Sequence, residues 1–504
     1  MTPASAPIRR ILAIEFVVGM AALGSEIAAA RLLAPYFGDS TLIWANTIGT
    51  VLVALSVGYW VGGRAADRNP SLRGLCRLVL IASGLIALVP FVAGPFLGEA
   101  VDALDAIEAG AFVGSLIAVL VLIAVPVFVL GMISPYAVRL SVAAVEEAGT
   151  VTGRLWAVST LGSLAGTFLS ALVLIPFAGT KRTFLIFALA LALVSLLGLA
   201  RRAVLAPIAL AILVALPVGT IKAAEPGDTL LDEAETEYGY ARVVEKASGD
   251  RWMELNEGQA IHSLLPEDGS HLTGGYWDEP LVLPFAASST PPARVAILGN
   301  AGGTTARAYG YYFPQTRVDA VEIDDELTEM GRAYFDLRGE NLHTHTADAR
   351  PWLRRSDGRF DLIVVDTYRQ PYIPFYMTTR EFFELARDRL APGGMVVINV
   401  GHPESSDDLE QVLSATMDDV FATVLRDPVQ DTNTMLVGSD AEVSGELLAE
   451  RVRDLPAELR PVALATAARL ASRLPGGKVY TDDVAPVEWL VDASIVQVAS
   501  DGER

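Results

Sequence analysis

Cysteine is almost absent from this sequence, because Cys76 is the only one in 504 residues. A single thiol cannot form an internal disulfide, so a fold held by a disulfide framework is excluded. Histidine is also scarce, and all five histidines follow position 224. Among them, His262, His343 and His345 lie in no arrangement typical of a zinc site. The sequence therefore predicts no metal centre.

Basic side chains are outnumbered in the second part of the chain. Residues 1–224 carry 14 Lys and Arg against 10 Asp and Glu, whereas residues 225–504 carry 24 against 49. Such an excess of negative charge repels phosphates, so we expect no nucleic-acid partner. The apolar content of 52% excludes a disordered chain. Together these features predict a membrane half followed by an acidic soluble half.

Long apolar runs are confined to the first part of the chain. A helix that spans a bilayer needs about 20 mostly apolar residues. Candidate spans cover residues 11–34, 41–62, 78–97, 110–133, 155–178, 183–200 and 203–221. The last is the weakest candidate, because Pro207 and Pro217 interrupt it. We therefore predict a membrane domain of about seven helices over residues 1–222, in contact with the lipid bilayer of the cell membrane.

Arginines predict which loops of the membrane domain face the cytoplasm. They precede the first span and follow the second, fourth and sixth, at Arg9, Arg10, Arg64, Arg68, Arg73, Arg77, Arg139, Arg154, Arg201 and Arg202. Seven spans would then place the soluble half outside the cytoplasm. If residues 203–221 lie at the membrane surface instead, the soluble half faces the cytoplasm. We weakly favour the cytoplasm, because the nucleoside cofactor inferred below is made there.

Three charged residues lie in or near the first span: Glu15, Glu26 and Arg31. Charges inside a membrane are costly, so such residues are candidates for a functional role. The alternative is that Glu26 and Arg31 form a structural pair near the end of a helix.

The soluble half shows two successive patterns. Short strand patterns at 240–246 and 251–255, separated by a Ser-Gly-Asp turn, predict a small β-rich segment over residues 223–290. Over residues 291–504, apolar strands alternate with helices, which predicts a parallel sheet covered on both faces. Strands are expected at 294–299, 318–324, 361–366 and 394–400, and a helix at 379–390.

Polar residues follow three of these strands, at the edge where parallel sheets bind their ligands. Gly299, Asn300 and Gly302 form a glycine-rich turn after the first strand, where the backbone can approach a ligand closely. Glu322 lies in the segment that ends the second strand and suits two ribose hydroxyls. Asp366 ends a wholly apolar strand, where a carboxylate is costly unless it has a task.

A further acid, Asp348, is followed by the small residue Ala349 in the loop before Pro351. An acid with a small neighbour suits the amino group of an adenine. Together with the glycine-rich turn and Glu322, it predicts a site for a nucleoside cofactor.

Several segments resemble the spermidine synthase family, and specifically its membrane-fused bacterial relatives. In the membrane half these are residues 26–40, 57–68 and 153–179; in the soluble half they are EYGYARVVE (237–245), LNEGQAIHS (255–263), VEIDDEL (321–327), DAR (348–350), DLIVVD (361–366), LAPGGMVVINV (390–400) and YTDDVAPVEWL (480–490). The resemblance implies a Rossmann-like domain of the adenosylmethionine-methyltransferase type, fused to the multi-spanning helical domain with the small β segment between them. A homodimer is plausible on the same ground.

The resemblance also implies an activity, the transfer of an aminopropyl group from decarboxylated S-adenosylmethionine to putrescine. Asp366 would then accept a proton from the attacking amine, Glu322 would hold the ribose, and Asp348 the adenine. An amine must be neutral to attack, so a carboxylate at the site both anchors it and accepts its proton.

The chain departs from the family pattern at positions that would bind the amine. The usual GGGDGG turn reads GNAGGT (299–304) and lacks its acid, and Arg369 stands where a second acid follows the catalytic one. The segment with Tyr276 and Asp278 differs from a Tyr-Gln-Glu stretch that contacts ligands. His262 replaces a glutamine. The candidate substrate-binding residues are therefore His262, Tyr276, Asp278 and Tyr368.

Lost acids weaken recognition of a dicationic substrate, so three functions stay open. The first is a membrane-bound aminopropyltransferase that acts on putrescine or a related amine. The second is a methyltransferase-like enzyme that uses S-adenosylmethionine on a lipid or envelope substrate, which the missing turn acid favours. The third is a non-catalytic membrane partner protein, against which the retention of Asp366 argues.

Overall fold

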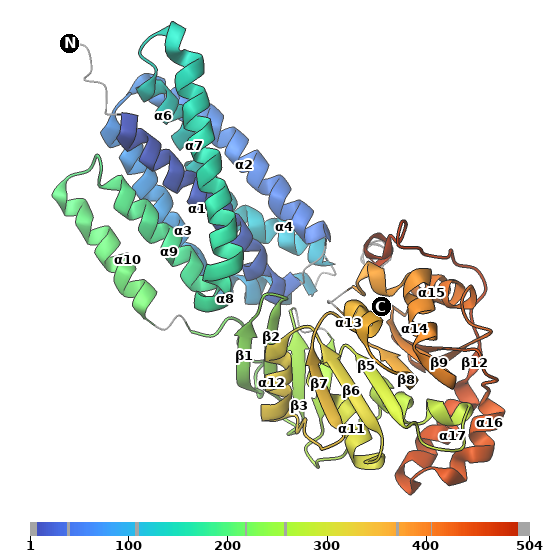
Figure 1. Cartoon of the computed structure of the whole chain (residues 1–504). Helices are drawn as coiled ribbons and strands as arrows, with labels where there is room; N and C mark the ends of the chain where they lie inside the picture. Colours follow the sequence, from blue (N-terminus) through green and yellow to red (C-terminus); the bar gives the residue numbers. More distant parts are fainter. Residues whose placement is uncertain are drawn as a thin grey trace. The chain divides into compact units, whose positions relative to one another are not determined.

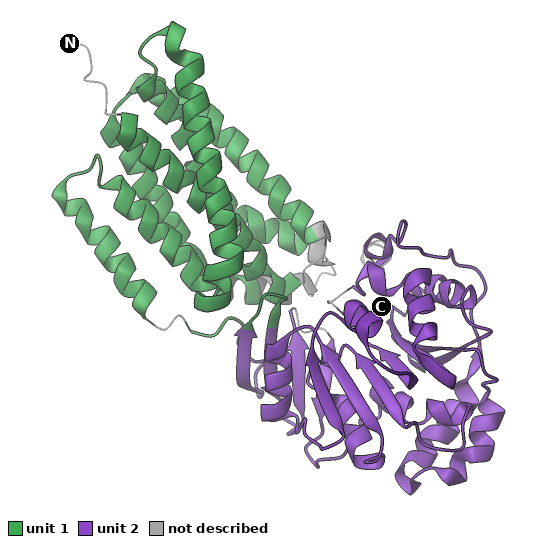
Figure 2. Ribbon diagram, in the orientation of Figure 1, with its two compact units in different colours: residues 1–223, 235–240 green, residues 224–234, 241–504 purple. Residues whose placement is uncertain are grey.

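The computed structural model describes residues 8–37, 41–105, 110–216, 219–256, 260–368, 372–404 and 406–491. The chain divides into two compact units, coloured green and purple in Figure 2. One contains residues 1–223 and 235–240, and the other contains residues 224–234 and 241–504. We refer to them as the helical unit and the α/β unit.

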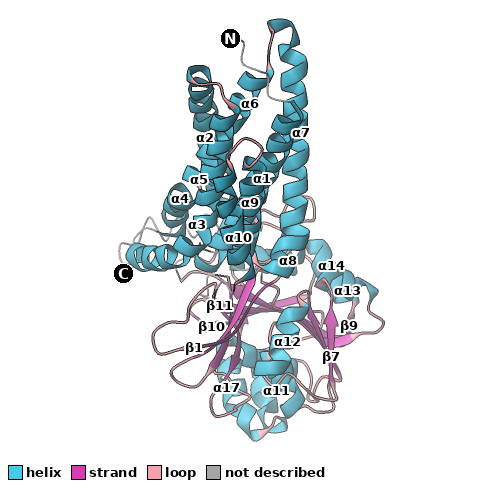
Figure 3. Cartoon of the chain, turned by 90° about the vertical axis from the view of Figure 1, so that its left-hand side faces the viewer, coloured by secondary structure: helices cyan, strands magenta, loops and turns pink. Residues whose placement is uncertain are grey.

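The helical unit is a bundle of α-helices (Figures 1 and 3). Its helices are α1 (Ile8–Phe37), α2 (Thr41–Arg68), α3 (Leu72–Asp105), α4 (Gly110–Leu122), α5 (Ala124–Gly131), α6 (Ile133–Ser141), α7 (Ala148–Leu169), α8 (Ile175–Ala178), α9 (Thr180–Ser195) and α10 (Leu205–Ala215). Stretches long and apolar enough to cross a membrane are Ile8–Phe37, Ile43–Arg68, Leu72–Gly98, Ala124–Ser141 and Val145–Ala178. Among the described residues these are five, and the fourth begins later than the predicted span at 110–133.

The sixth and seventh predicted spans are the shorter helices α9 and α10, with 16 and 11 residues. At 1.5 Å per residue they are about 24 and 17 Å long, less than the roughly 30 Å of bilayer hydrocarbon. By length and composition, the described part of the chain offers five helices that could span a membrane, and the count of about seven stays a prediction. Of the two prolines in the seventh predicted span, Pro207 lies in the first turn of α10, and Pro217 lies outside the described residues.

The α/β unit contains two sheets. The smaller has the order β1-β2-β3-β4, formed by β1 (Thr229–Glu235), β2 (Tyr240–Glu245), β3 (Arg251–Leu255) and β4 (Ile261–Leu265). Strands β2, β3 and β4 pair antiparallel. The two strands that the sequence predicted here, at 240–246 and 251–255, are confirmed.

The larger sheet has the order β12-β10-β11-β9-β8-β5-β6-β7. Its strands are β5 (Arg294–Leu298), β6 (Arg317–Glu322), β7 (Leu342–Thr346), β8 (Phe360–Val365), β9 (Leu390–Gly401), β10 (Thr423–Gln430), β11 (Asn433–Ser439) and β12 (Ala471–Ser472). Strands β7, β6, β5, β8 and β9 run parallel, whereas β11 pairs antiparallel with both β9 and β10. The order reverses direction between β5 and β8, which is the switch point of a Rossmann-like, methyltransferase-type sheet.

Helices cover both faces of this sheet, because its central strands are apolar on both sides. In β5, Ala296 and Leu298 join one buried cluster, and Val295 and Ile297 join the other. The first cluster includes residues of α13 (Ala349–Arg355), α14 (Arg380–Asp388) and α15 (Asp408–Asp418). The second includes residues of α11 (Thr304–Tyr312), α16 (Gly445–Arg451) and α17 (Arg460–Arg469). Helix α12 (Asp325–Tyr334) instead packs with β2 and β3.

Candidate functional site

A glycine-rich turn joins β5 to α11 and has little room for side chains. Gly299 has a φ of +83°, and a Cβ atom there would lie 2.2 Å from the carbonyl oxygen of Asp366. The N–H of Gly302 donates to Ser263 Oγ at 2.8 Å. Gly303, with a φ of +87°, then begins α11. The turn therefore brings the ends of β5 and β8 into backbone contact, as glycine allows and other residues do not.

Glu322 ends β6 and is only 7% exposed. Its Oε2 accepts a hydrogen bond from Ala301 N at 2.8 Å, and its Oε1 accepts from Ile323 N at 2.9 Å and Asp324 N at 3.2 Å. Burial raises the pKa of this carboxyl, although the backbone donors act in the opposite direction. Glu322 thus lies at the predicted strand end and also ties the glycine-rich turn to β6, a role that the sequence did not reveal.

Asp366 follows β8 and has two hydrogen-bond donors. Asn399 Nδ2 donates to its Oδ1 at 2.9 Å, and the hydroxyl of Tyr276 donates to the same carboxylate. Burial raises the pKa of Asp366 to about 6, and the two donors hold it from rising further. At neutral pH the group is therefore mostly ionised, yet it can accept a proton.

Asn399 on β9 is a site residue that we did not predict from the sequence. It is 3% exposed, and its Oδ1 accepts from Asn433 Nδ2 on β11 at 2.9 Å. This bond turns the amide so that its Nδ2 faces Asp366. The signal was present, since Asn399 interrupts an apolar strand just as Asp366 ends one.

Tyr368 lies close to Asp366, but its hydroxyl bonds to the backbone of β9. It donates to the carbonyl of Asn399 at 3.3 Å and accepts from Gly401 N. Burial raises its pKa. Tyr368 therefore holds the segment after β8 against β9.

A small cavity of about 20 Å³ lies at Asp366. It is lined by His262, Trp277, Ile297, Gly299, Asn300, Ala301, Thr304, Thr305, Val364 and Asp366. Among the described residues of this lining, Asp366 is the one acid, and none is a Lys or Arg.

Orphaned polar atoms face this cavity. His262 Nε2 and both polar side-chain atoms of Asn300 are buried and have no hydrogen-bond partner within the described chain. Burial lowers the pKa of His262 to about 4, so its ring is neutral. Buried polar atoms without partners are costly, and here they are free to bind a ligand.

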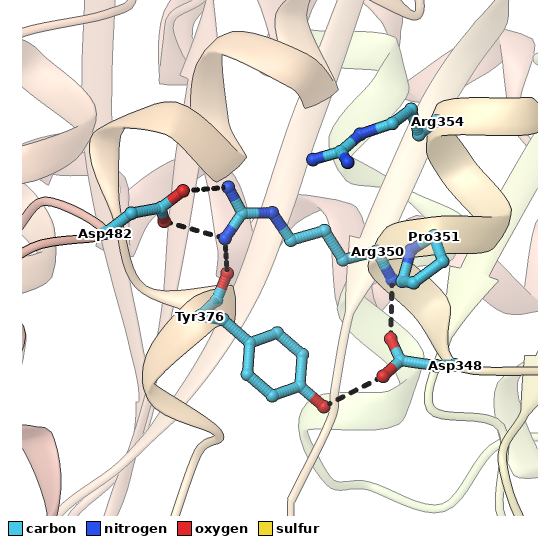
Figure 4. Close-up of a pocket in the computed structure, with 6 residues that line it drawn as sticks. All are labelled: Asp348, Arg350, Pro351, Arg354, Tyr376 and Asp482. Carbon is cyan, nitrogen blue, oxygen red and sulfur yellow. Dashed lines mark hydrogen bonds and ion pairs between the residues drawn. The ribbon is translucent and has the colours of Figure 1, made fainter.

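Asp348 lines a different pocket, of about 320 Å³ (Figure 4). Its Oδ1 accepts from Arg350 N at 3.1 Å, which caps α13, and its Oδ2 accepts from the hydroxyl of Tyr376 at 3.2 Å. Arg350 in turn forms two hydrogen bonds of 2.7 Å with Asp482. The described lining also includes Pro351 and Arg354, and Ala349, the first residue of α13, is buried. Among the described residues, this pocket and the Asp366 cavity have no lining residue in common.

The structure does not bring the predicted residue Asp278 to the cavity. Its carboxylate accepts from Thr273 N, Thr273 Oγ1 and Gly274 N, so it shapes the loop before Tyr276. The neighbouring Trp277, which the sequence did not single out, lines the cavity instead. Arg369 lies outside the described residues.

Comparison with known proteins gives one family. Residues 281–430 match the spermine/spermidine synthase domain. The chain is 32% identical over 290 residues to a probable polyamine aminopropyl transferase of Bifidobacterium longum, covering 53% of this chain and 64% of that protein. It is 28% identical over 180 residues to a polyamine aminopropyltransferase of Vibrio vulnificus, covering 34% of this chain and 59% of that one. The chain thus spans about six tenths of the length of these two relatives.

A third relative matches over a longer stretch. Polyamine aminopropyltransferase 2 of Ralstonia nicotianae is 28% identical over 420 residues, or 77% of this chain and 78% of that one. The match therefore extends beyond the α/β unit into the helices. Among solved structures, a probable spermidine synthase from Corynebacterium glutamicum is 23% identical, with a TM-score of 0.39, and covers 51% of this chain and 97% of that one.

Proposed function

We propose that the α/β unit is an aminopropyltransferase, because the chain is similar to members of the spermidine synthase family. The reaction would move an aminopropyl group from decarboxylated S-adenosylmethionine to putrescine or a related amine. The observation that carries the proposal is Asp366, a carboxylate fixed by Asn399 and Tyr276 beside a cavity with orphaned polar atoms.

Asp366 suits the role of proton acceptor. An amine that attacks a carbon becomes a substituted ammonium and must lose a proton. A carboxylate with a pKa of about 6 is ionised at neutral pH and can take that proton. Before the attack, the same negative charge attracts the amine. The neutral His262 does not compete for the proton, because burial has lowered its pKa to about 4.

The residues present fit a nucleoside co-substrate. The glycine-rich turn, Glu322, and the Asp348 pocket offer a close backbone approach and carboxylates for hydroxyl and amino groups. When bound there, the sulfonium of such a co-substrate would supply an electrophilic carbon. Among the residues that the structure describes, the lining of the Asp366 cavity includes no Lys or Arg. The similarity to proteins named aminopropyltransferases favours the decarboxylated form over methyl transfer.

Binding and turnover of the purified full-length protein test this function. Isothermal titration should show tighter binding of decarboxylated S-adenosylmethionine than of S-adenosylmethionine, with methylthioadenosine as the product control. Asp366→Asn keeps the shape and removes the proton acceptor, so turnover should fall by about 100-fold or more while nucleoside affinity changes little. Equal turnover in the Asn variant, or preference for the carboxylated nucleoside, would contradict the assignment.

We also propose that the helical unit spans a membrane with its arginine-rich end in the cytoplasm. That end combines the start of α1 with the helix ends and connections between α2 and α3, α6 and α7, and α9 and α10. These segments hold Arg9, Arg10, Arg64, Arg68, Arg73, Arg77, Arg139, Arg154, Arg201 and Arg202. Arg10 Nη1 donates to the carbonyl of Leu197 at 3.3 Å, so the first and last of these segments lie side by side. An excess of Lys and Arg marks cytoplasmic loops.

The chain leaves the helical unit at the opposite end. Arg31, near the end of α1, donates to the carbonyl of Thr236 at 3.2 Å, and Thr180 N donates to Glu235 Oε2 at 2.6 Å. The hydroxyl of Tyr36 donates to the carbonyl of Ile221 at 3.0 Å. Residues 180, 221 and 235–237 thus gather at the end of α1 that lies away from Arg10.

Reporter fusions test the side of the membrane. Alkaline phosphatase, which is active only outside the cytoplasm, should be inactive when fused after Arg202. When fused after Gly239, the phosphatase should be active if the distribution of arginines determines the placement. It should be inactive if the α/β unit lies in the cytoplasm, where the cofactor is made, which is the placement that the sequence favoured. The geometry of the helix ends supports the first result.

A further inference from the structure

A carboxyl group that the proposed transferase does not use is buried inside the helical unit. Glu15 of α1 is 0% exposed, between Ile14, also 0% exposed, and Val18, 3% exposed. Placing a carboxylate in apolar surroundings is costly unless its charge is compensated. For this reason an ionisable group inside a helical bundle of this kind points to a function.

The partners of Glu15 are hydroxyls from two other helices. Ser134 Oγ of α6 donates to Glu15 Oε2 at 2.9 Å, and Ser159 of α7 also hydrogen-bonds to the carboxylate. Helix α7 can come this close because Gly19 has no side chain. A Cβ atom at that position would lie 2.2 Å from the carbonyl oxygen of Ser159. Three helices therefore meet at one carboxyl group.

No positive charge accompanies this group. Within the described chain, no Lys, Arg or His forms a hydrogen bond or ion pair with Glu15, and Arg10 on the same helix donates to the carbonyl of Leu197 instead. The second oxygen, Oε1, is buried and has no hydrogen-bond partner in the described chain. When ionised, the Glu15 carboxylate therefore has no positively charged partner in the described chain, and its Oε1 is an unpaired acceptor.

The helix that carries Ser134 is interrupted beside it. Helix α5 ends at Gly131 and α6 begins at Ile133. Pro135 has no N–H, so it cannot donate to the carbonyl of Gly131 one turn earlier. In secondary transporters, breaks in helices free backbone carbonyl oxygens that help to coordinate cations.

We propose that Glu15 is a reversible binding site for one small monovalent cation, a proton or an alkali-metal ion, with Ser134 and Ser159 as its hydroxyl partners. Either cation neutralises the carboxylate, and each meets the free oxygen Oε1. The proposal does not depend on the function of the α/β unit, because it rests on residues of the helical unit alone.

Carbodiimide labelling of the full-length protein in lipid nanodiscs tests the site. Dicyclohexylcarbodiimide reacts with carboxyl groups that carry a proton in an apolar environment, and mass spectrometry locates the adduct. Labelling of the peptide that contains Glu15 should fall by about tenfold for each pH unit above its midpoint, as for a single proton. If added Na⁺ or K⁺ also lowers the labelling at constant pH, the ligand is the alkali-metal ion; if neither does, it is the proton.

Variants separate this site from other carboxyl groups. Glu15→Gln should remove the adduct while keeping an oxygen that can accept from Ser134. Glu26→Gln, on the same helix, should leave the labelling of Glu15 unchanged. Ser134→Ala should let labelling persist to higher pH, because a lost donor disfavours the ionised form.

Two results would overturn the proposal. One is labelling of Glu15 that does not vary with pH or salt, which indicates a permanently protonated structural group. The other is the absence of labelling together with the absence of any titrating carboxyl band in the infrared spectrum that Glu15→Gln removes. The infrared measurement needs no access for a reagent, so it decides the case in which the carbodiimide cannot reach the site.

Discussion

Replacing Asn399 with alanine should make the proposed transfer reaction more sensitive to acid. Asn399 Nδ2 donates to Asp366 Oδ1 at 2.9 Å, and this bond stabilises the ionised form of the carboxylate. Without it the pKa of Asp366 should rise above its present value of about 6. Asp366 can accept a proton only when it is ionised. A raised pKa therefore lowers the fraction of enzyme with an ionised Asp366 at neutral pH but not at alkaline pH.

The size of the effect follows from the hydrogen bond. A bond to a charged acceptor contributes about 1.5–3 kcal/mol, and one pKa unit corresponds to about 1.4 kcal/mol. The pKa of Asp366 should therefore move to about 7–8 in the variant. At pH 7 the ionised fraction would fall from about 90% to about 10–50%, a loss of roughly two- to tenfold in turnover. At pH 9 the loss from this cause should be less than twofold.

The assay is the release of methylthioadenosine by the full-length protein between pH 6 and pH 9, as a ratio of variant to parent at each pH. The ratio cancels the titration of the acceptor amine, which is common to both. Asn341→Ala is a suitable control, because Asn341 Nδ2 donates to the carbonyl of Thr316 at 2.9 Å, outside the site. A ratio for Asn399→Ala that is constant with pH would refute the role of this amide in setting the pKa of Asp366.

Four further changes have defined outcomes. Glu322→Ala should weaken methylthioadenosine binding in calorimetry by about 2 kcal/mol, since it also frees the turn at Ala301, and unchanged affinity would remove Glu322 from the site. Gly299→Ala should abolish that binding because of the 2.2 Å contact, whereas Gly393→Ala, with a similar φ of +82° but open space, should cost only about 1 kcal/mol of stability. Arg426→Ala should lower the free energy of unfolding by about 3 kcal/mol in denaturant titration, because it leaves the fully buried Glu410 unpaired. Burial opposes ionisation of Asp319, but bonds from Arg317, His345 and Arg294 lower its pKa to about 2, so stability should be lost as pH falls from about 4 towards 2, and Asp319→Asn should flatten that loss.

The strand ends of the α/β unit could be predicted from the sequence because two simple rules act there. Apolar runs such as residues 361–366 form strands that are buried on both faces, and parallel strands bring their carboxyl ends to one edge. Gly299, Glu322 and Asp366 accordingly lie at the ends of β5, β6 and β8.

What the sequence could not give is the use made of each carboxylate. Asp348 caps α13 and meets Tyr376, which lies 28 residues away in the chain. Asp278 lies two residues after Tyr276, where the sequence suggested a ligand-binding acid. Its oxygens instead accept hydrogen bonds from the N–H groups of residues 273–274. Such partners are set by the packing of distant segments, and no local pattern records them. Asn399 differs from these acids, because its signal is local: a buried amide within the apolar strand 394–400 needs a partner, as a buried acid does.

The number of spanning helices bears less on the orientation than the ends of the last two helices do. Residues 180 and 235 meet at one end of the helical unit, Leu197 meets Arg10 at the other, and Ile221 is back beside Tyr36 at the first. Helix α9 therefore runs from the first end of the unit to the other, and the segment with α10 returns to the first end. Whether both helices or neither are counted as crossings, the total number of crossings is odd. If the α/β unit lies outside the cytoplasm, its nucleoside must reach it from that side of the membrane. The chemistry proposed for Asp366 does not depend on this, because it is tested on purified protein. The fusion experiment and the turnover experiment can thus fail independently, so a phosphatase-active fusion at Gly239 would change the source proposed for the co-substrate before it changed the reaction.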